Sequence, residues 1–221
     1  GPKTVLEGQF GFLRVFCTEF DEAELTKGLG RDFVTLSTVL KRYPVHATAH
    51  AAVRAVRDLQ AAHGFAGSDV EGITVTGSKR MVERHAIAEP ADLMLAQYSI
   101  PFCVALALFR EARDPESYDE SALSDPQIRA LTRRVKLVPE AASGGHGGHG
   151  GAMGSTVTLV LADGRRFERH VDSGLLEPGE LPDKFTRLCR GALGEAGAAR
   201  LFARLQKLED EASLDWLGQQ V

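Results

Sequence analysis

Hydrophobic residues, most of them alanine, run through positions 45–63 without a glycine or a proline. Such a composition favours a helix. The preceding pair, Tyr43-Pro44, strengthens the prediction, because a proline suits the first turn of a helix and forces an extended residue before it. We therefore predict a helix over about 45–63, with Lys41 just outside its N-terminus and His46 in its first turn.

Alternation and turn residues predict strands farther along the chain. Residues 70–76 alternate between apolar and polar positions, and a strand over 135–139 should end at its proline. Asp163-Gly164, flanked by alternating hydrophobic residues, is the strongest hairpin signal in the sequence. The mixed stretch 33–41 is compatible with a further short strand.

A second buried helix and several shorter ones complete the pattern. Ser99 is a good N-cap with a proline in the turn that follows, and the segment from there to Phe109 is apolar on all sides, so this helix should be buried. A short helix is expected over 127–132. A helical tail should open near Asp183, with one apolar face formed by Leu201, Phe202, Leu205 and Leu208.

The order of these elements predicts an α+β fold with an inserted domain. We expect a helical segment over residues 1–30, an α+β domain over 31–172 and returning helices over 173–221, which is typical of a small domain inserted between the parts of a helical one. Residues 143–154 are rich in glycine and contain His146 and His149. We interpret them as a linker, with adventitious metal binding as the alternative.

Composition argues against nucleic-acid-binding, membrane-spanning and secreted proteins. The chain has 221 residues, of which 43% are hydrophobic, and this is enough for a real core. A formal charge of −4 argues against a nucleic-acid binder. Three widely spaced cysteines with apolar neighbours favour reduced thiols in the cytoplasm. The longest apolar run, 100–109, is too short to span a membrane, and the sequence lacks the order of a signal peptide.

The start of the first helix is chemically suited to an anion. Unpaired N–H groups at a helix N-terminus attract negative charge, and the ammonium group of Lys41 adds a full positive charge nearby. A histidine such as His46 can exchange a proton near neutral pH. The residues themselves therefore predict a place for a carboxylate or a phosphate.

Several segments together resemble the MmgE/PrpD family, which includes 2-methylcitrate dehydratase, cis-aconitate decarboxylase and iminodisuccinate epimerase. Their order and spacing along the chain carry the resemblance. The matching segments are Gly1-Pro2, Leu6-Glu7-Gly8, Gly11-Phe12, Lys41 to His46 with His50, Ala96 to Phe102 with Ala105 and Ala107, the Asp163-Gly164 hairpin, and Lys184-Phe185.

The resemblance covers the second half of a family member. It implies a helical domain interrupted by a small α+β lid, with the active site between the two. The lid of decarboxylase-like members supplies a lysine and a histidine that match Lys41 and His46, whereas their other catalytic residues belong to a helical half that the sequence does not show. A lid tyrosine of the decarboxylase falls near Met81 or Val82, and its absence argues against decarboxylation of cis-aconitate.

Three further residues, His50, Tyr43 and Ser99, can each be interpreted as structural or as part of the site formed by Lys41 and His46. His46 and His50 are four positions apart and would share a helix face, so a metal pair is conceivable, but no further ligands follow at suitable spacing. We expect no metal, and we interpret His50, together with Tyr43, as supporting the site from behind. Ser99 is expected to cap its helix first, with a secondary substrate contact as the alternative.

The expected function is that of a lid-bearing subunit or half of a cofactor-independent lyase or isomerase. Lys41 would bind a carboxylate of a small carboxylic or polycarboxylic acid, and His46 would move a proton at the adjacent carbon. The resemblance implies a helical N-terminal half, as a subunit or a chain fragment, and a dimeric assembly. Two alternatives remain: an inactive ligand-binding or structural subunit, and an enzyme repurposed for a specialised biosynthetic step.

Overall fold

A computed structural model describes residues 1, 3–140 and 154–219. Contacts divide the chain into an N-terminal unit, residues 1–38, and a main unit, residues 39–221. Most of the predicted glycine-rich linker, including His146 and His149, lies outside the described residues. The predicted boundaries at residues 30 and 172 stay predictions.

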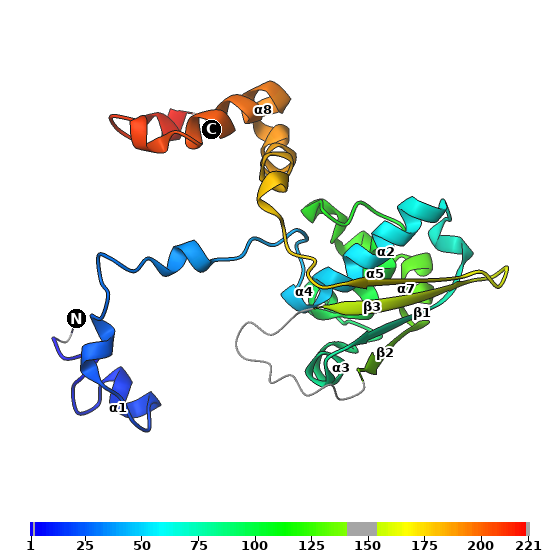
Figure 1. Ribbon diagram of the computed structural model, residues 1–221, viewed down its shortest axis with the longest axis horizontal. Coiled ribbons are helices and arrows are strands. Elements are labelled where there is room, and N and C mark those ends of the chain that lie inside the picture. Colours follow the sequence, from blue (N-terminus) through cyan, green and yellow to red (C-terminus); the bar gives the residue numbers. More distant parts are fainter. Residues whose placement is uncertain (2, 141–153, 220–221) are drawn as a thin grey trace. The chain divides into compact units, whose positions relative to one another are not determined.

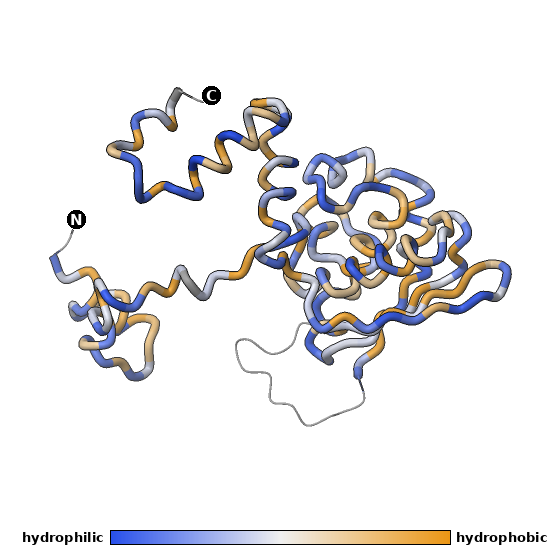
Figure 2. The backbone as a smooth tube through the Cα atoms, turned by 45° about the horizontal axis from the view of Figure 1, so that its top comes forward, coloured by the Kyte–Doolittle hydropathy of each residue, from blue (hydrophilic) through white to orange (hydrophobic). Residues whose placement is uncertain are grey.

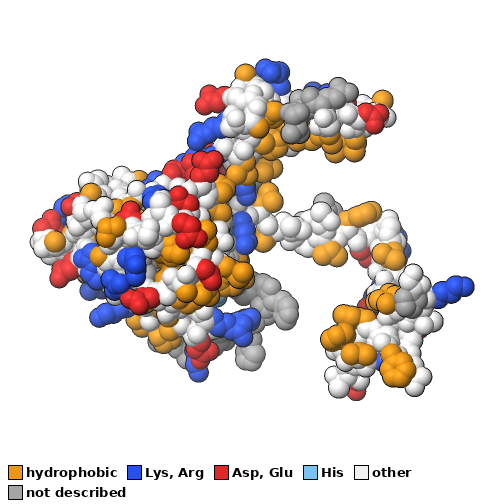
Figure 3. All heavy atoms as spheres, turned by 180° about the vertical axis from the view of Figure 1, so that it is seen from behind, with side chains coloured by type: hydrophobic (Ala, Val, Ile, Leu, Met, Phe, Trp, Pro, Cys, Tyr) orange, Lys and Arg blue, Asp and Glu red, His pale blue; other side chains and the backbone are white. Residues whose placement is uncertain are grey.

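The N-terminal unit contains only short helical turns. The α-helix α1 covers Phe12–Phe16, and 3-10 helices cover Glu22–Leu25 and Val34–Ser37. The short strand considered for 33–41 is wrong, because 3-10 turns occupy its centre. Large hydrophobic side chains are exposed on this unit, among them Phe10 and Phe16, and Figure 3 shows such side chains over its surface.

The main unit is built on a four-stranded mixed sheet with the order β2-β1-β3-β4 (Figure 1). β1 runs parallel to β2 and antiparallel to β3, and β3 runs antiparallel to β4. The strands expected at 70–76, at 135–139 and around the hairpin are confirmed. Their bounds are Val70–Gly77 for β1, Val135–Pro139 for β2, Ser155–Leu161 for β3 and Arg166–Val171 for β4.

Short helices surround a buried central one. α5 is buried along its whole length and packs against α2 and α7, while α2 also covers β3 and β4. The chain is therefore an α+β protein, as predicted. The helices are α2 (His50–His63), α3 (Lys79–His85), α4 (Leu93–Tyr98), α5 (Ile100–Ala107), α6 (Glu120–Ser124), α7 (Pro126–Thr132) and α8 (Leu181–Leu205). Further 3-10 helices cover Ala47–Ala49, Gly67–Asp69, Pro115–Ser117, Pro178–Glu180, Leu208–Asp210 and Asp215–Gln219.

The core lies between the helices and one face of the sheet. Ile73 and Val75 of β1 and Val157 and Leu159 of β3 are buried, whereas the residues between them are at most half-buried. Alternation of this kind is expected when one face of a sheet packs on a core. Figure 2 shows the matching hydrophobic stretches in the strands and in the helices that cover them.

The first long helix begins later than predicted. His46 has an extended backbone, with φ −61° and ψ 140°, and precedes the 3-10 turn Ala47–Ala49, so the α-helix starts only at His50. The reason is tertiary: the N–H of His46 donates to the carbonyl of Gln97 at 2.9 Å, which holds residue 46 outside the helix. The helix ends at Gly64, whose positive φ of 66° suits a C-terminal cap.

Three helices, α3, α4 and α6, were not predicted. Each begins at a side-chain cap, because Ser78 Oγ accepts from the N–H of Met81 at 3.2 Å, Asp92 Oδ1 from that of Leu95 at 2.8 Å and Asp119 Oδ1 from that of Ala122 at 2.8 Å. All three helices are short, and α3 is rich in charged residues. Their hydrophobic period is therefore too brief to stand out in the sequence.

The C-terminal tail is helical, as expected, but not straight. α8 is interrupted at Gly194, whose φ of 67° and ψ of 168° lie outside the helical region. α8 ends at Leu205, and Leu208 belongs to a separate 3-10 turn. The predicted apolar face of four residues is therefore shared between two elements. In the described residues, no helix combines the length and the apolar character needed to cross a membrane.

Within the main unit, the incoming segment around Leu40 and the segment between β4 and α8 run side by side (Figure 1). The N–H of Leu176 donates to the carbonyl of Leu40 at 3.0 Å. The Arg42 guanidinium forms an ion pair with Glu180 and also donates to the carbonyl of Leu175 at 3.3 Å. These bonds fix the backbone next to Lys41.

Candidate functional site

Lys41 lies on the surface where these two segments meet. Its side chain is exposed, and its backbone carbonyl accepts a hydrogen bond from Nζ of Lys184 at 2.5 Å. The half-buried ammonium group of Lys184 on α8 thus lies against the backbone of Lys41, whose own ammonium group is exposed. Lysine ammonium groups at such a surface are suited to a carboxylate.

His46 is held at both its backbone and its ring. Its backbone is fixed to Gln97 as described above, and its half-buried ring bonds through Nδ1 to the hydroxyl of Thr48. The backbone N–H of Thr48 donates to the same nitrogen at 3.4 Å. Among the described residues, Nε2 of His46 has no hydrogen-bond partner, so this nitrogen is free for a ligand.

Two residues that the sequence did not single out complete the surroundings of His46. His85, the last residue of α3, bonds through Nε2 to Thr48 Oγ1 at 3.2 Å and through Nδ1 to the carbonyl of Tyr98 at 3.0 Å. The ring of His46 lies 4.5 Å from that of His85 and 4.7 Å from that of Tyr98, between centroids. We call His46, Thr48, His85 and Tyr98 the histidine cluster.

A sequence signal for His85 existed but was weak. Ser78 is a good N-cap, and Met81 and His85 are four positions apart, so both lie on one face of the helix that Ser78 starts. Both are buried in the structure. Tyr98 stands inside the segment 96–102 that carries the family resemblance, but nothing in that segment indicates a contact with His46.

The surroundings keep His46 neutral. Burial lowers the pKa of His46 below its usual value, and the nearby charges of His85, Lys41 and Arg80 lower the pKa further. A histidine with a lowered pKa is unprotonated near pH 7. It can therefore accept a proton, which is what a general base must do.

His50 and Tyr43 form a buried pair of rings. The ring of Tyr43 packs against that of His50 with 5.4 Å between centroids, and both side chains are buried. Burial raises the pKa of Tyr43 to about 12 and lowers that of His50 to about 4. The carbonyls of Val45 and Gly174 act in the opposite direction on His50, although neither ring nitrogen has a partner with hydrogen-bond geometry.

The expected shared face of His46 and His50 is wrong, because His46 precedes the α-helix that starts at His50. The ring of His46 packs on His85 and Tyr98, whereas that of His50 packs on Tyr43. Residues 1, 3–140 and 154–219 contain no group of three or more His, Cys, Asp or Glu side chains placed to hold a metal ion.

Ser99 caps α5, as predicted. Its hydroxyl accepts from the N–H of Phe102 at 3.0 Å and donates to the carbonyl of Ile87 at 2.5 Å, and its side chain is fully buried. A substrate contact by this hydroxyl would require one of the two bonds to be exchanged. In the described fold, Ser99 therefore anchors the loop before α4 and the start of α5.

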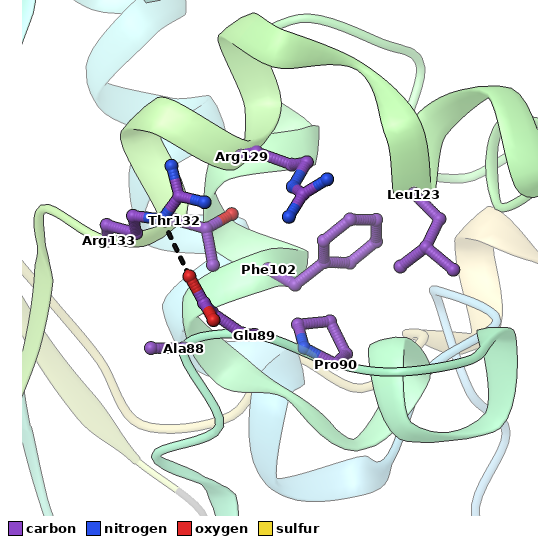
Figure 4. A pocket seen from close by; sticks show the side chains of 8 residues that line it. All are labelled: Ala88, Glu89, Pro90, Phe102, Leu123, Arg129, Thr132 and Arg133. Carbon is purple, nitrogen blue, oxygen red and sulfur yellow. Dashed lines mark hydrogen bonds and ion pairs between the residues drawn. The ribbon is translucent and has the colours of Figure 1, made fainter.

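Two hollows lie outside the histidine cluster. One, shown in Figure 4, has Phe102 and Leu123 in its lining and an ion pair of 2.9 Å between Glu89 and Arg133 at one side. The other lies at the base of α8. Its lining residues are Arg42, Arg113, Leu176, Glu180, Asp183, Lys184 and Arg187. Through Lys184, this second hollow adjoins the backbone of Lys41.

Residues 43–210 match the family model of the MmgE/PrpD C-terminal domain. The match covers more than half of the chain and includes His46, His85 and Ser99, while Lys41 stands two residues before it. No curated protein matches the chain. The match agrees with the resemblance that the sequence motifs indicated, including its restriction to the C-terminal half.

Proposed function

The chain belongs to the MmgE/PrpD family, whose members include dehydratase-like enzymes, and from this membership we propose that it forms the lid side of the active site of a cofactor-independent lyase or isomerase. The proposed substrate is a small carboxylic or polycarboxylic acid. The reaction would be a dehydration, a decarboxylation or an epimerisation that proceeds by acid–base chemistry.

The observation that supports this proposal is the state of His46. Its Nδ1 is bonded inside the protein, its Nε2 is free among the described residues, and its pKa is lowered. A neutral imidazole with one free nitrogen can remove a proton from a carbon next to a carboxylate. The electron pair of that C–H bond then remains on the substrate as negative charge.

We assign to Lys41 the stabilisation of that negative charge. The charge of its ammonium group contributes to the lowered pKa of His46, and in this proposal Lys41 binds a carboxylate whose neighbouring carbon faces Nε2 of His46. A fixed cation beside the developing charge lowers the barrier to proton removal. Lys184, bonded to the backbone of Lys41, holds this residue in place and adds positive charge.

We further propose that a helical half, on another chain or another part of the same protein, supplies the opposite wall of the site. Exposed hydrophobic side chains on the N-terminal unit, such as Phe10 and Phe16, are suited to packing against helices. A dimeric assembly in the cytoplasm is part of the same proposal. The free thiols of Cys17, Cys103 and Cys189 are consistent with a reducing compartment.

The proposal can be tested by isolating the chain with its natural neighbours. We expect a helical partner to copurify in a fixed ratio. The assembly should then exchange the proton next to a carboxylate of a tricarboxylate or dicarboxylate for deuterium, measured by NMR in D₂O. A chain that stays alone, binds such acids and exchanges no proton would instead be a ligand-binding subunit.

A further inference from the structure

We infer that His46, Thr48 and His85 form a proton relay, in which His85 takes up the proton equivalent that His46 removes from the substrate. The inference deepens the proposed function and rests on its assignment of His46 as the base. It assigns a role to two residues, Thr48 and His85, that no motif indicated. Both act through His46 and are positioning residues.

The direction of the hydrogen bonds at His85 follows from the carbonyl of Tyr98, which cannot donate. The carbonyl of Tyr98 only accepts, so Nδ1 of His85, 3.0 Å away, must carry a proton. In a neutral His85 the other nitrogen, Nε2, is then an acceptor. The Thr48 hydroxyl, 3.2 Å from Nε2, has one proton to donate and donates it to this nitrogen.

At His46 the two contacts of Nδ1 belong to different states of the relay. In the resting state the Thr48 oxygen accepts the proton on Nδ1 of His46, because its own hydroxyl proton is engaged with His85. The backbone N–H of Thr48 can only donate, so its 3.4 Å bond to Nδ1 belongs to the other tautomer, after the proton has passed on. The relay therefore begins with the His46 tautomer whose proton is on Nδ1 and whose lone pair is on Nε2. The nitrogen that is free among the described residues is thus the basic one.

Proton removal reverses this chain of bonds without moving a heavy atom. Nε2 of His46 takes the substrate proton, and the electron pair of the C–H bond stays on carbon. The Nδ1 proton of His46 passes to the Thr48 oxygen, and the Thr48 hydroxyl proton passes to Nε2 of His85. The net result is a neutral His46 and a positively charged His85.

The surroundings accommodate both states. After the transfer Nδ1 of His46 has a lone pair, which can accept from the Thr48 hydroxyl and from the Thr48 backbone N–H at 3.4 Å. The charged groups that influence His46 are Lys41 on the incoming segment, with Arg80 and His85 on α3. Lys41 and Arg80 both oppose a lasting positive charge on the ring of His46, and this favours passing the proton onward.

A purely structural role for Thr48 would predict packing effects but no change in tautomer, which gives a direct test. The full chain is labelled with ¹⁵N-histidine, and long-range ¹H–¹⁵N NMR spectra are recorded at pH 8. Single His46→Gln and His85→Gln variants assign the signals. We expect the Nδ1–H tautomer for both His46 and His85, whereas an Nε2–H tautomer at His46 would overturn the relay.

Substitutions at Thr48 sharpen the test. Thr48→Val keeps the shape and removes the hydroxyl, so the ratio of the Nδ1–H to the Nε2–H tautomer at His46 should fall by about fivefold or more, as expected for the loss of one hydrogen bond. Thr48→Ser should keep the parent ratio. An unchanged ratio in Thr48→Val refutes the relay, and Thr48→Ala replaces this variant if Thr48→Val does not fold.

The experiment separates the relay from the proposed function, because tautomers are measured without a substrate. If the assembled enzyme fails to turn over any carboxylic acid but the tautomers are as expected, the proposed function fails and the arrangement of the cluster stands. In an active assembly, Thr48→Val should lower kcat about tenfold or more with little change in KM, and Thr48→Ser should restore it. An unchanged kcat would show that no proton passes through Thr48.

Discussion

The backbone N–H of His46 donates to the backbone carbonyl of Gln97 at 2.9 Å. This single bond joins the segment around Lys41 to the end of α4. It holds residue 46 in an extended conformation ahead of the helix. It also brings the ring of Tyr98, the next residue along the chain, to 4.7 Å from the ring of His46. The candidate base is therefore positioned by two segments that are distant in the sequence.

Replacing His46 should remove most of the activity of the assembled enzyme. We expect His46→Ala to lower kcat by about a hundredfold or more, because a positioned general base typically contributes at least that much. The measurement is steady-state turnover of a carboxylic acid substrate. His170→Gln, a change of an exposed histidine on β4, serves as the control. Near-parental turnover in His46→Ala would remove His46 from the reaction.

Lys41→Met tests the cation beside His46. Losing one charge-assisted contact to a carboxylate should raise KM by about tenfold or more. The same variant should raise the pKa of His46, because the charge of Lys41 helps to lower it. NMR titration of the His46 ring measures this second effect without any substrate. Lys136→Met on β2 is the matched control, and an unchanged pKa in Lys41→Met would place the ammonium group away from the cluster.

Gly174 should tolerate no side chain. A Cβ at this position would lie 2.1 Å from the backbone carbon of His50 and 2.2 Å from its carbonyl oxygen, so the segment that follows β4 would have to move off the start of α2. We expect Gly174→Ala to lower the free energy of unfolding by about 2 kcal/mol or more, measured by urea denaturation.

Gly179 gives a control for that experiment, because a Cβ there would meet no atom within 4 Å. Gly179→Ala should leave the midpoint of denaturation close to that of the parent. Equal stability of the two alanine variants would mean that the segment around Gly174 is not packed against α2 as described.

The buried ring of His50 should make the fold sensitive to acid. Its pKa is about 4 in the folded protein, against 6.5 for an exposed histidine. The unfolded chain therefore binds more protons between these values, and stability falls as the pH drops from about 6.5 towards 4. The full effect is about 3 kcal/mol.

A comparison with His50→Phe isolates this contribution, because the variant keeps a ring against Tyr43 and cannot titrate. The free energy of unfolding of each protein is measured at several pH values. We expect the parent to lose stability relative to His50→Phe below about pH 6.5. A constant difference between the two proteins across this range would rule out the buried neutral histidine.

Local signals in the sequence were sufficient for several elements. The serine cap and the unbroken apolar run predicted α5 and its burial, and Asp163-Gly164 predicted the β3–β4 hairpin, whose Gly164 has a φ of 87°. These features depend on residues within one element or one turn. Helices α3, α4 and α6 escaped prediction because each has fewer than eight residues, too few for a clear period, whereas the equally short α7 begins with a proline that marks its start.

The sequence by itself determined the α+β class, the family, and the pairing of a lysine with a histidine at 41 and 46. The tertiary structure decided which way His46 faces and what surrounds it. His46 turns away from His50 because a bond to Gln97 delays the helix, and Thr48 and His85 meet because α3 and α4 pack beside the 3-10 turn. The physical reason is that periodicity and caps act over a few residues, whereas the protonation of a histidine depends on atoms brought together by folding.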